Sequence, residues 1–211
     1  MSEQARRYWD QNAAAHTFAH PLNLDWLQAL PKEARILDYG CGYGRIVHEL
    51  TDAGWRNTVG VDFSAEMIER GRRAYPHLTL RHIEKTPIAE PDGAFDAATV
   101  FAVLTCIPDS DSQAALIAEL RRLLRPGGLL YVSEYPLQDD ERNRARYQTG
   151  ATRHGVYGVW DRDDGGVFRH HTREHLRALL AGFELVAERE VATVTLSGAP
   201  ATAIQLLGRR S

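Results

Sequence analysis

The chain has 211 residues, of which 44% are apolar and 25% are charged, a balance typical of a soluble globular protein. A formal net charge of -3 gives no attraction for nucleic acid or for an anionic membrane, and no run of about 18 apolar residues predicts a membrane span. The two cysteines, Cys41 and Cys106, lack the spacing of metal ligands or of a disulfide framework, so we expect no metal site and a cytoplasmic protein.

The first part of the chain alternates between helical and extended patterns. Alanine-rich residues 3–15 predict a helix, and residues 22–30 predict a shorter helix between two prolines. Strands are then expected at residues 35–39, 58–63, 78–83, 95–101 and 129–135. Helices are expected between them at residues 44–53, 64–75 and 109–124. Ser64 would cap the second of these helices, and Asp109 or Asp111 the third.

The second part of the chain begins with a polar segment, residues 136–171. Within it, the stretch 155–171 predicts a hairpin with its turn at residues 163–166. Thr172 would cap a helix that ends near Gly182. Two last strands, joined by a turn that suits an antiparallel pair, are expected at residues 183–196 and 201–208.

This order of elements predicts a three-layer, doubly wound α/β fold in which residues 1–211 form one domain. Its sheet would be mostly parallel, with seven strands and an antiparallel last strand. Ligands of such folds bind beyond the carboxyl ends of the strands. A glycine-rich loop lies at that position, directly after the first strand.

The loop is part of residues 38–44, DYGCGYG. Glycines in such a cluster indicate unusual backbone dihedrals or a ligand close to the backbone. Three explanations compete: a tight turn without a ligand, a dinucleotide site, and a site for S-adenosylmethionine. The dinucleotide fingerprint G-x-G-x-x-G needs its third glycine where this chain has Arg45, so a dinucleotide fits poorly.

The third explanation rests on a resemblance to a known family. DYGCGYG resembles motif I of the class I (Rossmann-like) S-adenosylmethionine-dependent methyltransferases, and Asp62 ends the second strand where that family binds the ribose hydroxyls. FDAATVFAVLTCIPD and LRRLLRPGGLLYVSE resemble later elements of the same family. The resemblance implies in-line transfer of a methyl group from S-adenosyl-L-methionine to a nitrogen, oxygen or sulfur atom of a small molecule. The product of the cofactor would be S-adenosyl-L-homocysteine.

The resemblance also implies which residues bind the cofactor. Residues 1–30 would form a helical lid over it, and Glu84 stands where the family usually has an aspartate for the adenine amino group. From their sequence alone, Phe63 and Met67 could equally belong to the core. The expected cofactor-binding residues are Tyr8, Trp9, Asp38, Gly40, Cys41, Gly42, Arg45, Asp62, Phe63, Met67, Glu84 and Phe101.

Residues 136–171 form the insertion in which this family varies its substrate site. A hydroxyl or protonated nitrogen acceptor requires a general base, which is most often histidine. We therefore expect the base to be His154, His170 or His171. The expected substrate residues are Tyr135, Tyr147, Arg153, Tyr157 and Trp160.

The insertion also contains Arg142, Arg144, Arg146 and Arg153 with no acid between them. They could bind a carboxylate or phosphate of the substrate, since arginine binds such groups in a bidentate manner. Alternatively, they lie on a solvated helix in which Asp140 pairs with Arg144 and Asp139 with Arg142. We favour the solvated helix.

Other functions stay open at this point. The chain could bind the cofactor without catalysis, or use S-adenosylmethionine or a modified form of it for a transfer other than methyl transfer. Arg45 could face a carboxylated cofactor of that kind. The expected partner is a small-molecule acceptor, with neither nucleic acid nor membrane, and the protein would be a monomer or a homodimer.

Overall fold

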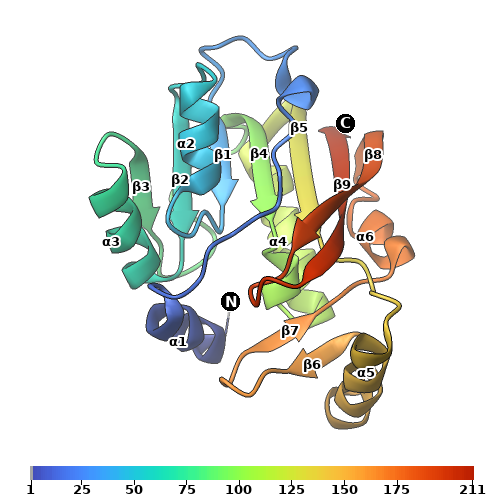
Figure 1. The fold of residues 1–211 in the computed structure, drawn as a ribbon. Coiled ribbons are helices and arrows are strands. Elements are labelled where there is room, and N and C mark those ends of the chain that lie inside the picture. Colours follow the sequence, from blue (N-terminus) through green and yellow to red (C-terminus); the bar gives the residue numbers. More distant parts are fainter. Residues whose placement is uncertain (1) are drawn as a thin grey trace.

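A seven-stranded sheet forms the centre of the computed structural model, which describes residues 2–211 (Figure 1). Its strands are β1 (Ile36–Tyr39), β2 (Thr58–Asp62), β3 (Thr79–His82), β4 (Phe95–Phe101), β5 (Leu124–Glu134), β8 (Phe183–Val194) and β9 (Pro200–Arg210). They lie in the order β3-β2-β1-β4-β5-β9-β8; β1 to β5 are parallel, and β9 is antiparallel to both β5 and β8. The predicted α/β fold, with its mostly parallel sheet and antiparallel last strand, is confirmed.

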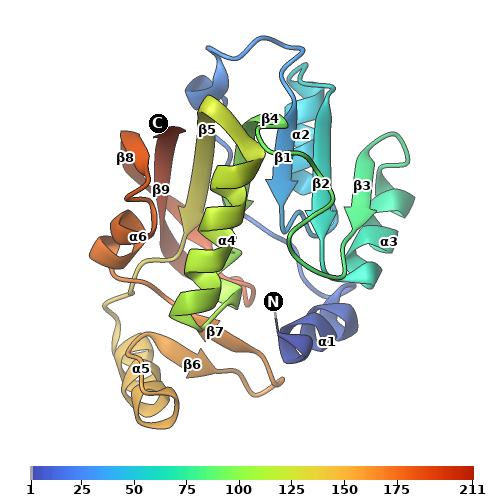
Figure 2. The ribbon, with the colours of Figure 1, turned by 180° about the vertical axis from the view of Figure 1, so that it is seen from behind.

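Helices cover both faces of this sheet. α2 (Arg45–Asp52) and α3 (Ala65–Ala74) lie on the face turned toward the viewer in Figure 1. α4 (Ser110–Leu123) and α6 (Arg173–Leu179) lie on the opposite face, which Figure 2 shows. The two helical layers and the sheet between them are the three layers that the sequence predicts. No helix among residues 2–211 is both long and apolar enough to cross a membrane.

Three of these helices begin at the predicted capping residues. The Ser64 hydroxyl accepts the backbone N–H of the third residue beyond it at 3.1 Å, and the Thr172 hydroxyl does the same at 3.1 Å. Asp109, rather than Asp111, caps α4 through a 2.7 Å bond of the same kind. Each side chain satisfies a backbone donor that the first helical turn leaves unpaired.

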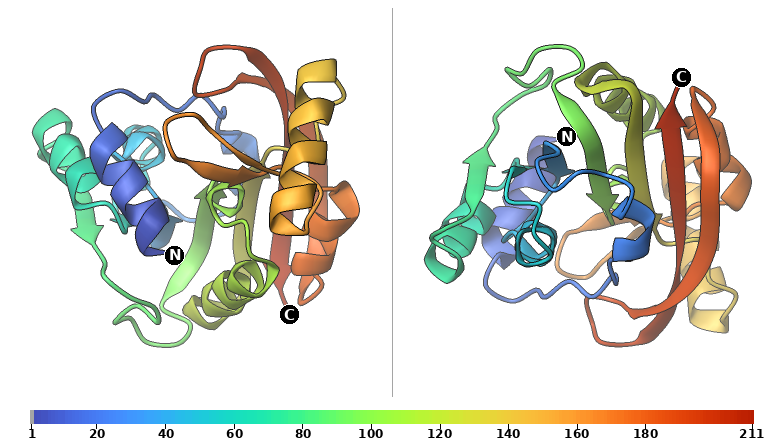
Figure 3. Two further views of the ribbon diagram at one scale, coloured as in Figure 1. Left: turned by 90° about the horizontal axis from the view of Figure 1, so that it is seen from below. Right: turned by 90° about the horizontal axis from the view of Figure 1, so that it is seen from above.

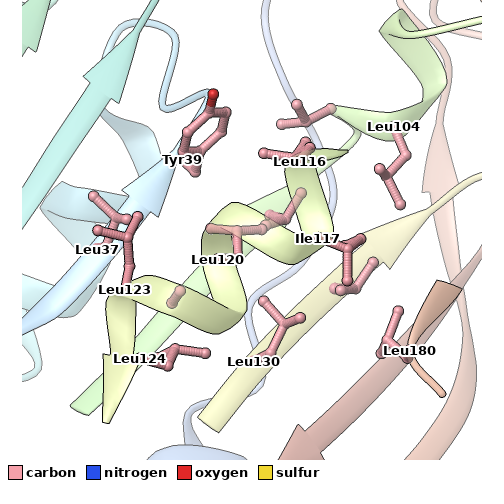
Figure 4. Packing of buried hydrophobic residues seen from close by; sticks show 14 of the residues in the cluster. Leu37, Tyr39, Leu104, Leu116, Ile117, Leu120, Leu123, Leu124, Leu130 and Leu180 are labelled. Carbon is pink, nitrogen blue, oxygen red and sulfur yellow. The ribbon is translucent and has the colours of Figure 1, made fainter. Parts of the chain in front are cut away.

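The largest hydrophobic cluster lies between α4 and the sheet. The helical spacing of Leu116, Leu120 and Leu123 places these side chains on one face of α4. They pack against Leu37 of β1 and Leu130 of β5 (Figure 4). Burial of each such leucine contributes roughly 1.5–3 kcal/mol to stability. This packing fixes the central strands, whose carboxyl ends carry the glycine loop.

Four short elements lie beyond these carboxyl ends, as seen from below in Figure 3 (left). They are α1 (Glu3–Asn12), α5 (Glu141–His154), β6 (Val159–Asp161) and β7 (Val167–Arg169). β6 and β7 pair in an antiparallel manner, which confirms the predicted hairpin.

The hairpin contacts the N-terminal helix. The N–H of Arg162 donates to the carbonyl of Gly166 at 2.8 Å and closes the hairpin turn. The Tyr8 hydroxyl of α1 donates to Asp164 in this turn at 3.2 Å, and the Tyr8 ring packs edge-on against Phe168 at 5.5 Å. Segments from opposite ends of the sequence therefore close over the same edge of the sheet.

α1 is shorter than the predicted helix over residues 3–15. It ends at Asn12, and the guanidinium of Arg70 donates to the carbonyls of Ala13 and His16 at 2.6 Å each. Beyond Asn12 the N–H of Ala15 donates to the Asn12 carbonyl at 3.1 Å, a tighter turn than that of an α-helix. A tertiary contact therefore replaces the last helical turn.

The helix predicted over residues 22–30 is only the short 3-10 helix η1 (Leu24–Leu27). The N–H of Asn23 donates to the Tyr131 hydroxyl at 3.2 Å, and Gln205 donates to the carbonyl of Pro21 at 2.7 Å. These bonds to β5 and β9 hold the start of the segment in an extended conformation. The sequence contains no local signal for them.

The close packing of α5 against β6 at Gly150 leads to a first prediction, which concerns the stability of the fold. A Cβ atom at this position would lie 1.8 Å from the carbonyl oxygen of Val159, so α5 and β6 would have to separate. Alanine usually stabilises a helix relative to glycine, yet we expect Gly150→Ala to lower the free energy of unfolding by about 1–3 kcal/mol. Urea denaturation measures this, with Thr149→Ala on the exposed side of α5 as the control. A stabilised Gly150→Ala protein would contradict this packing.

Candidate functional site

A cavity of about 670 Å³ lies at the carboxyl ends of the central strands. Small-molecule sites typically occupy roughly 300–1,000 Å³. The walls come from the glycine loop, the ends of β2, β4 and β5, the segment 17–20, α5, the β6–β7 hairpin and the turn between β8 and β9. The cavity therefore lies where a doubly wound fold is expected to bind its ligand.

The glycine loop turns sharply along one wall of this cavity. Gly40, Gly42 and Gly44 have φ angles of 72°, 54° and 84°, in the left-handed region that favours glycine. A Cβ atom on Gly40 would lie 2.5 Å from Val103, and one on Gly42 would lie 2.6 Å from Phe18. The glycines thus permit the sharp turn that their cluster indicates, and they also admit two of the protein's own side chains, which the sequence does not predict.

Asp38 lies at the end of β1 with one carboxylate oxygen unpaired. Its register partner in β4 is Thr99, whose hydroxyl donates to Oδ1 at 2.7 Å. Oδ2 is buried and has no hydrogen-bond partner among the described residues. Burial raises the pKa of Asp38 to about 7. A buried acceptor of this kind, in the wall of a cavity, suits the ammonium group of an amino-acid ligand.

Asp62 anchors the opposite side of the loop. Its Oδ2 accepts the N–H of Gly42 at 2.8 Å, and its Oδ1 accepts the N–H of Ser64 at 2.8 Å. These two bonds fix the plane of the carboxylate. Each carboxylate oxygen has a second lone pair, so the residue can still accept hydrogen bonds from two neighbouring hydroxyl groups. The geometry therefore fits the ribose diol of an adenosyl cofactor.

Most of the expected cofactor-binding residues line the cavity. These are Trp9, Asp38, Gly40, Cys41, Gly42, Arg45, Asp62, Met67 and Phe101. Arg45 is already engaged, because it pairs with Glu49 at 2.6 Å and donates to the carbonyl of His20 at 2.7 Å.

Three other expected cofactor-binding residues lie outside the lining. The Tyr8 hydroxyl points to His16 and Asp164. Phe63 is buried in the core against Tyr39. Glu84 lies exposed in the loop after β3. A contact of Glu84 with adenine stays a prediction.

Of the three expected bases, His170 lines the cavity. Its Nδ1 lies 2.5 Å from the Tyr147 hydroxyl, and burial lowers its pKa well below the usual value. His154 lies near the surface and pairs with Asp161 at 2.9 Å. His171 is buried away from the cavity, 2.9 Å from the side-chain nitrogen of Gln113.

Some of the expected substrate residues line the cavity and others do not. Tyr135 and Trp160 line the cavity, and Tyr147 lies fully buried behind His170. Arg153 pairs with Asp161 at 3.3 Å, and Tyr157 is 47% exposed; neither belongs to the lining.

The arginines of the insertion lie on a helix, α5, as favoured from the sequence. The expected ion pairs are wrong, however. Arg144 pairs with Asp139 at 2.6 Å, while Asp140 caps the helix through the N–H of Asn143 at 3.0 Å. Arg142 and Arg146 lie on the side of α5 that lines the cavity.

Two residues of the segment 17–20 belong to the site although the sequence does not predict them. Phe18 lines the cavity and stacks on Tyr43 with ring centroids 5.4 Å apart. His20 is buried and lines the cavity, with its Nδ1 2.9 Å from the Ser133 hydroxyl and no partner for its Nε2. Burial and the nearby Arg45 lower the pKa of His20 to about 3. The segment is extended, so no periodic pattern could have marked either residue.

Glu134 is a further residue that the sequence analysis missed. Its buried carboxylate accepts the N–H groups of Leu104 and Thr105 at 2.7 and 3.0 Å, and the Thr105 hydroxyl at 2.8 Å. These bonds hold the short helix η2 (Leu104–Cys106), whose residues Thr105 and Cys106 line the cavity. The role of Glu134 is to position this wall.

Comparisons with known proteins identify a family for this chain. A family model described as a methyltransferase domain matches residues 4–188. The chain is 30% identical over 142 residues to a ubiquinone biosynthesis O-methyltransferase of Methylococcus capsulatus, which covers 63% of this chain and 58% of that protein. It is 37% identical over 112 residues to a demethylmenaquinone methyltransferase of Beutenbergia cavernae, covering 53% of this chain and 45% of that protein. The chain thus spans about half the length of these curated relatives.

The fold is also found among solved structures. A SAM-dependent methyltransferase from Methanosarcina mazei matches with a TM-score of 0.84 at 24% identity. The match covers 90% of this chain and 99% of that one.

Proposed function

The chain belongs to the class I S-adenosylmethionine-dependent methyltransferase family, and we propose that it methylates a nitrogen, oxygen or sulfur atom of a small molecule. The observation that carries the proposal is the pair of carboxylates, Asp38 and Asp62, on either side of the glycine loop in one cavity wall. One of them has a buried oxygen that lacks a donor, and the other is held rigidly by two backbone N–H groups.

In this proposal Asp38 would hold the ammonium group of the cofactor, Asp62 its ribose hydroxyls, and Met67 one face of its adenine. Bound S-adenosylmethionine supplies a methyl group on a sulfonium, which is a good leaving group. The main task of the protein is then to hold the acceptor in line with that methyl group. Such positioning can lower the barrier by about 7–11 kcal/mol. Aromatic walls, to which Tyr135 and Trp160 contribute, would exclude water and tolerate the cationic group.

The other segments have roles in the same proposal. Residues 1–30 would cover the cofactor, with Trp9 and Phe18 as their contributions to the cavity wall. Residues 136–171 would bind the acceptor. We place the protein in the cytoplasm, where its two buried, unpaired cysteines would stay reduced.

We propose His170 as the general base for an acceptor that must lose a proton. The Tyr147 hydroxyl can donate to the Asn143 amide oxygen at 3.3 Å and accept a hydrogen bond from His170 Nδ1–H, in the tautomer that leaves Nε2 unprotonated. His170→Gln should then lower kcat by at least about tenfold, with little effect on the binding of S-adenosylhomocysteine. Since burial lowers the pKa of His170 well below the usual value, its protonation should cause no loss of activity as the pH falls to the usual histidine pKa of about 6.5.

Single-turnover kinetics and a pH profile test this role, with His154→Gln as the matched control outside the cavity lining. Full activity of His170→Gln on an acceptor with a hydroxyl or ammonium group would exclude His170 as the base. In that case the base would be His20, the other histidine of the cavity lining, whose Nε2 has no partner among the described residues.

The function itself is tested with tritium-labelled S-adenosylmethionine and a panel of phenols, amines and thiols. We expect labelled product from at least one acceptor class with the wild-type protein and none with Asp62→Ala. Tight binding of S-adenosylhomocysteine without any labelled product would favour a binding module. Absence of binding would refute the proposed function.

A further inference from the structure

Two buried hydrogen-bond donors belong to a stacked pair of side chains on the wall formed by α5 and β6. The guanidinium carbon of Arg146 lies 3.5 Å from the ring centroid of Trp160, and both residues line the cavity. Arg146 Nε and Trp160 Nε1 are buried and have no hydrogen-bond partner within residues 2–211. Neither group can accept a hydrogen bond, and a buried donor without a partner is costly. A ligand that fits this wall therefore has to offer acceptor oxygens.

Arg146 also forms no ion pair, although Asp140 acts on its charge from a greater distance. No carboxylate of the described chain lies within 4.0 Å of its guanidinium, although the side chain is only partly exposed. Three neighbouring arginines do have partners: Arg144 pairs with Asp139, Arg153 with Asp161, and Arg162 with Asp164. His170 adds no positive charge, since burial lowers its pKa well below the usual value. The ligand group that meets Arg146 should therefore be an anion.

The surroundings also bear on the charge of this anion. Arg142 lines the cavity as well and has no carboxylate within 4.0 Å among the described residues. Asp140, Asp161 and Asp163 line it too, and their carboxylates would repel a dianion such as a phosphate monoester more strongly than a monoanion. A carboxylate carries one charge and two oxygens, which matches one guanidinium and one indole N–H.

The body of the ligand should be flat. Trp160 stacks on Phe168 with centroids 5.4 Å apart and an interplanar angle of 30°, and Tyr135 stacks on His170 at 5.2 Å and 23°. All four residues line the cavity. Side chains of this kind favour aromatic rings in offset or edge-to-face contact.

We propose that the methyl acceptor is an aromatic carboxylic acid, and that its carboxylate binds the guanidinium of Arg146 and the indole N–H of Trp160. This inference rests on the proposed function, because it concerns the acceptor side of the same cavity. Arg153, which the sequence analysis expected in a substrate role, is paired with Asp161 and takes no part in it.

The test compares acids with their neutral amides on protein saturated with S-adenosylhomocysteine. The probes are 4-aminobenzoate against 4-aminobenzamide, and 3,4-dihydroxybenzoate against 3,4-dihydroxybenzamide, titrated by calorimetry. At least one acid should bind wild-type protein about tenfold or more tighter than its amide, because a charged hydrogen bond is lost in the amide. Equal affinities in both pairs, or no binding of either acid, would overturn the inference.

Two substitutions of Arg146 make the test specific. Arg146→Met keeps an apolar stem on Trp160, and Arg146→Gln keeps a neutral donor; both should remove the preference for the acid and leave affinity for S-adenosylhomocysteine unchanged. Arg144→Met, on the same helix but already paired with Asp139, is the matched control and should keep the preference. A preference that survives in whichever Arg146 variant folds would contradict the assignment.

The two proposals fail in distinguishable ways. If wild-type protein does not bind S-adenosylhomocysteine, the proposed function is wrong. If it binds S-adenosylhomocysteine but does not distinguish acids from amides, only the inference about Arg146 is wrong.

Discussion

Replacement of Asp62 by alanine should weaken the binding of S-adenosylhomocysteine by about a hundredfold to ten-thousandfold, since two hydrogen bonds from ribose hydroxyls to a carboxylate would be lost. The same carboxylate accepts the N–H of Gly42 and that of Ser64. The substitution therefore also loosens the glycine loop, and this adds to the loss of affinity for S-adenosylhomocysteine. Calorimetric titration measures the affinity directly.

Two variants separate the role of Asp62 from a general effect on folding. Asp62→Asn keeps the size of the side chain and one acceptor oxygen, and should lose less affinity than Asp62→Ala. Asp52→Ala removes an exposed aspartate at the end of α2 and should bind as the wild type does. Undiminished binding by a folded Asp62→Ala protein would contradict the assigned ribose site.

Asp38→Asn should have opposite effects on stability and on binding. Burial raises the pKa of Asp38 to about 7 in the folded protein, whereas an exposed aspartate titrates at about 3.9. Between these pH values the unfolded chain releases a proton that the folded protein keeps, so the free energy of unfolding falls as the pH rises from about 4 to about 7. Because asparagine does not titrate, Asp38→Asn removes this fall in the free energy of unfolding. It should therefore stabilise the ligand-free protein at pH 8 by about 1–3 kcal/mol.

The same substitution should weaken the binding of S-adenosylmethionine by about tenfold or more, because the ammonium group would lose its counter-ion. Urea denaturation at pH 4.5 and pH 8, together with titration of the cofactor at pH 8, measures both effects. The Asp52→Asn protein should match the wild type in both. An Asp38→Asn protein that is less stable at pH 8 and binds the cofactor normally would show that Asp38 serves the fold rather than the ligand.

The sequence predicted those parts of the site that depend on local patterns. Asp38 lies near the end of a buried strand that the glycines follow directly, and Asp62 ends the next one, so the parallel arrangement alone brings them to one edge of the sheet. Ser64 caps α3 because the capping signal lies within a few residues of the helix start.

The other parts of the site depend on contacts between distant segments. His20 meets Ser133, which is 113 residues away, and Gln205 reaches Pro21 across 184 residues. No periodicity in residues 16–23 could indicate hydrogen bonds to residues so far away in the sequence. The position of Arg146 likewise depends on the packing of α5 against β6, where the carbonyl of Val159 leaves no room for a Cβ atom on Gly150.

A crystal structure of the complex with S-adenosylhomocysteine would test the central assignment most directly. We expect the ribose hydroxyls within hydrogen-bond distance of Asp62, the amino group at Oδ2 of Asp38, and the sulfur atom facing the wall that contains His170 and Trp160. A nucleoside bound elsewhere, or bound in this cavity with its sugar away from Asp62, would contradict the account.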